Sequence, residues 1–174
     1  MSTTEEHKRG IKKEFRCAVL TISSSRYAII ERKEGIEDRS GELIKRILKE
    51  NSHKVVVYEI LPDDEFVIKE TIISLAKSDI EVIISTGGTG LTSKDVTIEA
   101  VSALIEKDVP GFGELFRSKS YEEIGSAVVL TRALSGIINK KLIFCLPGSP
   151  NAVELALKEI IIPEIPHIMG HIRE

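Results

Sequence analysis

One stretch, from Glu81 to Ala100, constrains the fold more than any other part of the sequence. It reads EVIISTGGTGLTSKDVTIEA, so a short apolar run rich in β-branched residues leads into a glycine-rich break and then into a helical pattern. A strand that enters a glycine loop before a helix is a common phosphate cradle, because glycines let the backbone approach an anion and the first amides of the helix point at it. The glycines alone fit a hairpin-like turn with a helix-capping aspartate equally well.

The glycine loop differs from the two common phosphate cradles. Residues 87–90 read G-G-T-G and lack the last glycine of a Rossmann fingerprint. Lys94 lies between Ser93 and Asp95, where a Walker loop requires Gly-Lys-Ser/Thr. Asp95 is the more informative residue, because a carboxylate beside bound phosphates is repulsive unless a metal ion lies between them. The stretch therefore predicts a phosphate ligand that carries Mg²⁺.

Strands and helices alternate along the rest of the sequence. Near-continuous apolar runs, typical of strands buried on both faces, lie at Phe15 to Ile22, Val55 to Leu61, Val82 to Ile84 and Leu142 to Leu146. Apolar residues at helical spacing follow these runs, within 43–48, 68–76, 98–105 and 153–161. This alternation predicts an α/β fold, a three-layer sandwich around a mostly parallel central sheet.

Several segments are less regular. We expect an extended loop or flap from Tyr27 to Asp38, followed by a helix that Ser40 caps. The periodicity of residues 127–138 does not decide between helix and strand. Pro163 and Pro166 interrupt the last helical pattern, so we expect a loose tail there.

Polar residues follow the predicted strands, at the end that faces the ligand crevice of a parallel sheet. Ser23 and Arg26 follow the first strand, and Asp63 and Asp64 follow the second. One of these two acids should cap the next helix, which leaves the other available for a ligand. A second glycine turn, residues 147–151, follows the strand that ends at Leu146.

Length and charge restrict the class of protein. A chain of 174 residues fits one domain, since domains usually have about 100–150 residues; we expect that domain at residues 15–174, after a flexible tail at residues 1–14. The net charge of −3 argues against a broad nucleic-acid surface. No apolar run is long enough for a membrane span or a signal peptide, so we expect a cytoplasmic protein whose Cys17 and Cys145 are buried free thiols.

The motifs TGGTGLTSKDVTIEA, PGFGELFR, LTRALSGI and LPGSPNAV, taken together and in this order, resemble the molybdopterin adenylyltransferase and molybdenum cofactor biosynthesis protein B family. The resemblance runs from about Phe15 to Ile161. It implies the α/β sandwich of that family and an assembly into homotrimers or homohexamers. It also implies a reaction in which Mg-ATP adenylylates the terminal phosphate of molybdopterin and pyrophosphate is released.

The resemblance implies roles for individual residues. Asp63 and Asp95 match the family acids that we assign to Mg²⁺, as catalytic residues and metal ligands. Thr131 stands where the family usually has Ser, and Arg132 is a candidate phosphate clamp; both are expected to be catalytic. The residues expected to bind substrate are Ser23, Gly87, Gly88, Thr89, Gly90, Lys94, Glu114, Gly148, Ser149, Pro150 and Asn151.

Each assignment has a plainer alternative. Asp63 and Asp95 can be helix caps only, Thr131 a buried hydroxyl bonded within a helix, and Glu114 an exposed helix charge. Many relatives have Pro-Arg where this chain has Ser93 and Lys94; Lys94 keeps the charge but loses the bidentate fork.

A non-catalytic molybdopterin-binding or scaffold protein on the same fold is the alternative to an enzyme, because the fold alone does not decide function. The presence of both Asp63 and Asp95 favours the enzyme, since a protein that only binds the pterin has no need for paired metal acids.

Overall fold

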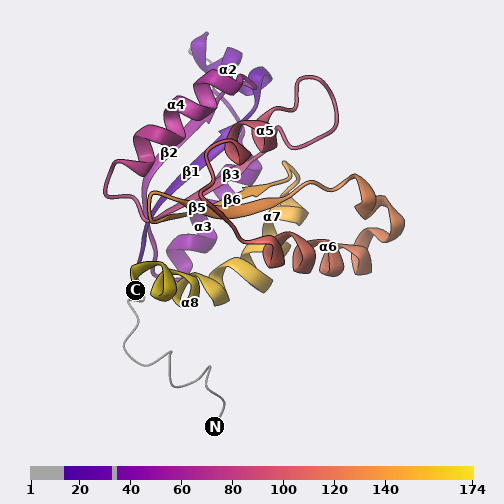
Figure 1. Ribbon diagram of the computed structural model, residues 1–174. Coiled ribbons are helices and arrows are strands. Elements are labelled where there is room, and N and C mark those ends of the chain that lie inside the picture. Colours follow the sequence, from indigo (N-terminus) through magenta and orange to yellow (C-terminus); the bar gives the residue numbers. More distant parts are fainter. Residues whose placement is uncertain (1–13, 33–34) are drawn as a thin grey trace.

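The computed structural model describes residues 14–32 and 35–174, in which a central sheet lies between two layers of helices (Figure 1). The tail expected at residues 1–14 lies, apart from its last residue, outside this part of the chain. The α/β sandwich is confirmed. None of the helices in the described ranges is both long and apolar enough to cross a membrane.

The sheet has six strands in the order β2-β1-β3-β6-β5-β4. β1, β2, β3 and β6 are mutually parallel, whereas β5 is antiparallel to both of its neighbours. The mostly parallel arrangement predicted from the sequence is therefore correct. The strands are β1 (Arg16–Ile22), β2 (Lys54–Leu61), β3 (Val82–Thr86), β4 (Lys107–Asp108), β5 (Leu134–Ile138) and β6 (Lys141–Leu146).

Helices cover both faces of the sheet. One face packs against α3 (Arg39–Glu50), α6 (Pro110–Ile124), α7 (Pro150–Ala156), the π-helical turn η2 (Leu157–Ile161) and α8 (Ile162–Arg173). The other face packs against α4 (Glu65–Ala76) and α5 (Thr97–Ser102). The remaining helices are α2 (Ser24–Glu31), which contacts β2, and the 3₁₀ helix η1 (Gly125–Leu130).

The central strands contribute to both hydrophobic cores. On β1, Cys17 and Val19 point into the core under α3 and α8, while Ala18 and Leu20 point into the core under α4. Burial on both faces explains why these strands read as continuous apolar runs. Cys17 and Cys145 are free buried thiols, as predicted, and burial raises the pKa of each to about 12.

The segment expected as an extended loop begins as a helix. α2 occupies Ser24–Glu31, and Ser23 is its N-cap, whose Oγ accepts a hydrogen bond from the Arg26 amide at 3.4 Å. This helix buries none of its residues, so it carries no apolar stripe. The prediction was wrong because sequence periodicity detects only helices that have a buried face.

Ser40 does not cap α3, contrary to expectation. The N-cap is Asp38, whose Oδ1 accepts from the Gly41 amide at 3.1 Å, while its Oδ2 accepts from Thr21 Oγ1 and Tyr58 Oη at 2.6 and 2.7 Å. These bonds hold Asp38 where the helix starts. Ser40 lies in the first turn of α3 and is free to bond elsewhere.

The loose tail predicted after residue 163 is a helix. α8 runs through Pro163 and Pro166 to Arg173 and buries Ile165 and Met169 against the core. Pro163 lies near the start of α8, which directly follows the π-helical turn η2. Both π-helical turns and prolines are common where a helix bends. Packing of its apolar side chains outweighs the backbone hydrogen bonds that the prolines remove.

The structure defines one segment that the sequence left undecided and shortens one predicted helix. The undecided residues 127–138 divide into the end of η1 and the strand β5. The helix expected to reach Ile105 ends at Ser102, and the short strand β4 follows. Both residues of β4 are exposed, so no apolar pattern marks them.

Candidate active site

The candidate site lies where the parallel strands β1, β2, β3 and β6 end. Ser23, Asp63, Gly87 and Gly148 each lie in the loop that follows one of these strands. Because the strands are adjacent and parallel, their carboxyl ends meet at one edge of the sheet. The structure therefore places these four strand-end residues at the same edge of the sheet.

The first glycine loop, residues 87–90, follows β3 and makes a turn that requires glycine. Gly87 and Gly88 have φ angles of +97° and +63°. A Cβ on Gly87 would lie 2.3 Å from the Ile22 carbonyl oxygen, and a Cβ on Gly88 would lie 2.3 Å from Thr97 Oγ1. Both positions therefore combine a left-handed backbone with contacts too close for any side chain.

The second glycine loop, residues 147–149, follows β6 and lies against the first. A Cβ on Gly148 would be 3.5 Å from the Gly87 Cα, which is ordinary contact distance. Ser149 caps α7, with its Oγ accepting from the Ala152 amide at 3.3 Å, and Pro150 is the first residue of that helix.

A hollow of about 460 Å³ opens between the two glycine loops. A second hollow of about 390 Å³ adjoins it and shares Thr131, Pro147 and Ser149. Asn151 and Pro150 line the second hollow only. The first is lined by Gly87, Gly88, Thr89, Gly90, Asp95, Leu130, Thr131, Arg132, Pro147, Gly148 and Ser149. The structure thus brings together most of the residues that the sequence predicts for the site.

Asp95 is not a helix cap. The N-cap of α5 is Val96, which makes no side-chain capping bond, and Asp95 Oδ2 instead accepts from the amide and Oγ1 of Thr92, at 2.9 and 2.6 Å. The hydrogen bond from the Thr92 side chain is the main cause that lowers the pKa of Asp95. The carboxylate is therefore ionised at neutral pH, and its bonds to Thr92 hold it beside the first glycine loop.

The two acids after β2 divide their roles as predicted. Asp64 caps α4 by accepting from the amides of Phe66 and Val67, at 2.9 and 3.0 Å. Asp63 Oδ2 accepts from the amide and the hydroxyl of Ser24, at 2.7 and 2.8 Å. Asp63 Oδ1 points to the first glycine loop, since it would lie 3.0 Å from a Cβ on Gly88. Asp63 therefore does not cap the helix that follows it.

The two carboxylates suit Mg²⁺. Asp63 uses Oδ2 for both of its bonds to Ser24, which leaves Oδ1 without a hydrogen bond from any described residue. Carboxylate oxygens are the hard ligands that this ion prefers, and proteins usually hold it through one or two carboxylates together with substrate phosphates. The described ranges contain no group of three or more His, Cys, Asp or Glu residues able to hold a metal, so such an ion would depend on the phosphates.

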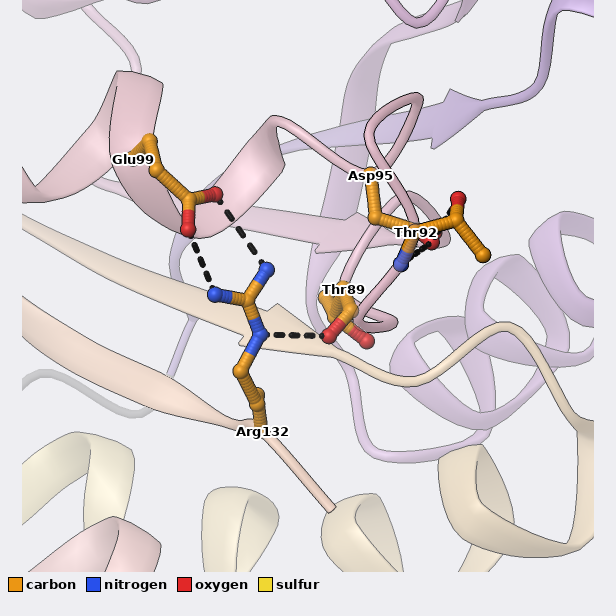
Figure 2. Close-up of polar contacts among 5 residues, drawn as sticks. All are labelled: Thr89, Thr92, Asp95, Glu99 and Arg132. Carbon is orange, nitrogen blue, oxygen red and sulfur yellow. Dashed lines mark hydrogen bonds and ion pairs between the residues drawn. The ribbon is translucent and has the colours of Figure 1, made fainter. Parts of the chain in front are cut away.

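Arg132 ties the first glycine loop to α5. Its Nε donates to the Thr89 carbonyl at 2.9 Å, and its terminal nitrogens bind both carboxylate oxygens of Glu99, at 2.5 and 3.2 Å (Figure 2). The Glu99 hydrogen bond is the main cause that raises the pKa of Arg132, and the same bond lowers the pKa of Glu99. The guanidinium is thus a fixed positive charge at the rim of the hollow.

Thr131 precedes this arginine in an extended conformation, with φ −81° and ψ 114°, directly after η1. It lines both hollows and is half-buried. It is therefore not a hydroxyl bonded inside a helix, which was the plainer alternative.

Three predicted binding residues lie outside the two hollows. Ser23 caps α2, Lys94 is exposed on the loop before α5, and Glu114 is exposed on α6. Sequence reasoning in turn missed Glu99 and Ser24. Ser24 is adjacent to the predicted Ser23 after the first strand, but Glu99 had no local signal because its partner, Arg132, is 33 residues away.

A family model described as a probable molybdopterin binding domain matches residues 18–167. The chain is 48% identical over 170 residues to molybdenum cofactor biosynthesis protein B of Bacillus cereus, which covers 97% of this chain and 96% of the relative. It is 45% identical over 175 residues to the molybdopterin adenylyltransferase of Pyrococcus furiosus, with 98% of each chain covered.

A solved structure shows the same fold. The crystal structure of the tungsten cofactor synthesizing protein MoaB from Pyrococcus furiosus superposes with a TM-score of 0.83 at 43% sequence identity. The superposition covers 94% of this chain and 99% of that one.

Proposed function

Because the chain belongs to the family of molybdopterin-binding domains, we propose that its site performs the adenylylation of molybdopterin, with Mg-ATP as the donor. A bond forms between an oxygen of the terminal phosphate of molybdopterin and the α-phosphorus of ATP. The bond from that phosphorus to the oxygen bridging to the β-phosphate breaks, and pyrophosphate leaves with its electron pair. The protein is thus a molybdopterin adenylyltransferase in molybdenum cofactor biosynthesis.

The observation that carries the proposal is the meeting of acids, amides and a cation around one glycine loop. Asp63 Oδ1 approaches Gly88, Asp95 lines the hollow, and Arg132 binds the Thr89 carbonyl. An acid pair beside a phosphate cradle is repulsive without a metal ion. A site for a phosphate ligand together with a divalent cation accounts for all of these groups.

The chemistry requires no general base. A phosphate monoester is already anionic near neutral pH, because its second pKa is about 6. The obstacle is to bring two polyanions together in line. The chain overcomes this obstacle by positioning the two substrates and by neutralising their charge, with loop amides and Arg132 placed around the hollow.

Asp63 and Asp95 would hold the Mg²⁺. When bound, that ion neutralises phosphate charge and helps to orient the reacting groups. The protein's own part is to keep both carboxylates in place, which Ser24 does for Asp63 and Thr92 does for Asp95.

The test is pyrophosphate release from Mg-ATP, measured with and without molybdopterin. We expect release that depends on the pterin and falls about 10²- to 10³-fold in Asp95→Asn and in Asp63→Asn, since each removes a charge at the reacting phosphates. Asp64→Asn is the matched control, because Asp64 is the N-cap of α4 and Asn can also cap a helix. Release in this control should equal that of the wild type.

Three outcomes would contradict the proposal or its assignment of the acids. Tight molybdopterin binding without pyrophosphate release in the wild type would support the non-catalytic binding protein instead. Release that does not need the pterin would indicate another acceptor. Equal loss of release in Asp63→Asn and Asp64→Asn would assign the effect to the loop as a whole.

We also expect a homotrimer or a homohexamer, as the family resemblance implies. Exposed apolar side chains along α6 and η1 support burial against another copy, because clusters of this kind usually mark interaction surfaces. They are Leu115, Tyr121, Ile124, Val129 and Leu130. Light scattering on the purified protein measures the assembly mass.

A further inference from the structure

The carbonyl groups of both glycine loops are bonded to donors inside the protein. Thr97 Oγ1 donates to the Gly87 carbonyl at 2.9 Å. Thr86 Oγ1 donates to the Pro147 carbonyl at 2.8 Å, and Ser40 Oγ donates to the Gly148 carbonyl at 2.7 Å. Each of these hydroxyl groups binds one carbonyl oxygen of a residue that lines the hollow.

The carbonyls of the next two residues of the first loop are engaged as well. The Gly88 carbonyl accepts from the Thr97 amide at 3.0 Å, and the Thr89 carbonyl accepts from Arg132 Nε at 2.9 Å. Among the described residues, none accepts a hydrogen bond from the amide of Gly88 or Thr89. The carbonyl oxygens of Gly87, Gly88 and Thr89 are therefore bonded within the protein, whereas the amides of Gly88 and Thr89 remain available to bind a ligand.

The donors are buried and come from different parts of the fold. Thr97 is 0% exposed at the start of α5, Thr86 is 1% exposed at the end of β3, and Ser40 is 4% exposed in the first turn of α3. A buried hydroxyl group without a partner is costly, so each one is strongly restricted to the carbonyl that it binds. The loops are thus fixed by three residues that do not line the hollow themselves.

The orientation of a peptide group decides what it offers to a phosphate. A carbonyl oxygen directed into the hollow would repel an anion, whereas an amide would bind it. Because a peptide group is planar, a hydroxyl that holds a carbonyl inward also turns the next amide to the opposite side. For Gly87 and Gly148, the next amides are those of Gly88 and Ser149, both of which line the hollow.

We infer that Thr97, Thr86 and Ser40 are positioning residues of the anion site. They hold the carbonyl oxygens of Gly87, Pro147 and Gly148 toward the protein interior and away from the hollow, so that the neighbouring amides face a phosphate group. The inference rests on the proposed function for the identity of the natural ligand. The site itself is one for the phosphate chain of a nucleotide or of pyrophosphate. Ser40 extends this role to α3, because it links the start of that helix to the second glycine loop.

The decisive comparison is Thr97→Val with Thr97→Ser, since valine keeps the shape of threonine and removes the hydroxyl, whereas serine keeps the hydroxyl. The probe is magnesium pyrophosphate, titrated by calorimetry into the purified full chain. We expect Thr97→Val to bind it roughly tenfold to hundredfold more weakly, the effect of losing one buried hydrogen bond. Thr97→Ser should bind within about threefold of the wild type.

Ser85→Ala is the matched control for Thr86→Val. Ser85 lies one residue earlier on β3, is also 1% exposed, and donates to the Phe144 carbonyl at 3.4 Å, away from both loops. Thr86→Val and Ser40→Ala should weaken pyrophosphate binding, whereas Ser85→Ala should not, even where all three lower the melting temperature. In the pyrophosphate-release assay, the positioning variants should raise KM for Mg-ATP more than Ser85→Ala does.

The outcomes separate this inference from the proposed function. If the folded Thr97→Val and Ser40→Ala variants bind pyrophosphate like the wild type, the inference is wrong whatever the enzyme does. It is also wrong if the wild type fails to bind pyrophosphate. If the wild type binds the probe, the hydroxyl variants lose it, and no pterin-dependent release occurs, the inference stands and the adenylyl-transfer proposal fails. If Thr97→Val does not fold, Ser40→Ala and Thr97→Ser decide the question.

Discussion

The two glycine loops lie against each other and are built in different ways. The first, residues 87–90, has Gly87 and Gly88 at positive φ and is followed by residues 91–96, which include Asp95 and lead into α5. The second spans residues 147–149 before α7 begins, and its Gly148 is not among the described residues with positive φ. The left-handed backbone conformations therefore lie in the first loop, and the negative charge of Asp95 follows it.

This difference indicates a division of roles. The first loop has a backbone conformation and close contacts that exclude side chains at Gly87 and Gly88, and Thr97 and Arg132 hold it in place. The second loop leads directly into a helix that Ser149 caps and that Pro150 starts, which are ordinary helix-start residues. Small substitutions in the first loop should therefore lower stability or activity, whereas the second loop should tolerate them.

Gly87→Ala against Gly148→Ala is the strongest test of this difference. Alanine at residue 87 must adopt a positive φ with its Cβ 2.3 Å from the Ile22 carbonyl oxygen, whereas at residue 148 its Cβ meets the Gly87 Cα at 3.5 Å and the Gly87 N at 3.9 Å, both ordinary contacts. We expect Gly87→Ala to lower the free energy of unfolding by about 1–3 kcal/mol or more. It should also abolish most pyrophosphate release. Gly148→Ala should change the free energy of unfolding by less than about 1 kcal/mol, as measured by urea unfolding. Equal effects at both positions would remove the distinction between the loops.

Arg132→Lys tests how the first loop is held. Lysine keeps the positive charge but cannot bind the Thr89 carbonyl and both oxygens of Glu99 at once. We expect kcat/KM for pyrophosphate release to fall by roughly tenfold to hundredfold, the range for one or two lost charge-assisted hydrogen bonds.

The control for this variant is Arg39→Lys. Arg39 binds Glu37 with an Nε–Oε1 distance of 2.7 Å, but both side chains are more than two-thirds exposed and lie away from the hollow. This substitution should leave kcat/KM unchanged. A loss in Arg39→Lys as large as that in Arg132→Lys would show that the effect does not come from the glycine loop.

The fold could be predicted where side chains are buried on both faces of a strand. β1, β3 and β6 are buried along nearly their whole length and read as apolar runs, so the parallel sheet followed from them. α2 and β4 could not be predicted, because neither buries a residue. α8 was missed for the opposite reason: local proline chemistry argued against a helix that tertiary packing stabilises.

The candidate site was predicted where its chemistry is local. The glycine loop with Asp95, and the pair of Asp63 and Asp64, are recognisable within a few residues of sequence. The bond between Arg132 and Glu99 joins residues 33 apart, and the bond from Ser40 to Gly148 joins residues 108 apart. Pairings at such separations depend on the folded topology and leave no local pattern.

Asp38→Asn tests the support of the second loop from α3. Burial alone raises the pKa of Asp38, but hydrogen bonds from Thr21, Tyr58 and the Gly41 amide outweigh it, so the net pKa is lowered. A lowered folded-state pKa means that the ionised carboxylate stabilises the fold above the unfolded-state pKa of about 3.9, and that this stabilisation is lost as the pH falls through the folded-state value.

The expected result is a difference that depends on pH. At about pH 7, Asp38→Asn should unfold with a free energy about 1–3 kcal/mol lower than the wild type, because it weakens charge-assisted hydrogen bonds. The gap should narrow as the pH falls below about 4, where the wild-type carboxylate becomes protonated. Urea unfolding across this range measures it, and a gap that stays constant with pH would contradict the role of the charge.

Lys94→Ala should have the smallest effect, although Lys94 lies only four residues after the sensitive first loop. Its side chain is exposed and does not line the hollow, and its backbone amide, which binds Thr92 Oγ1 at 3.3 Å, is unchanged by the substitution. An exposed cation acts on a phosphate ligand mainly through a field that salt screens within about 10 Å at 0.1 M. We expect KM for Mg-ATP to rise by less than about threefold at low salt and the difference to vanish at about 0.5 M salt. A larger rise that persists at high salt would mean that Lys94 contacts the ligand directly, and the sensitive region would then extend beyond the first loop to the residues that lead into α5.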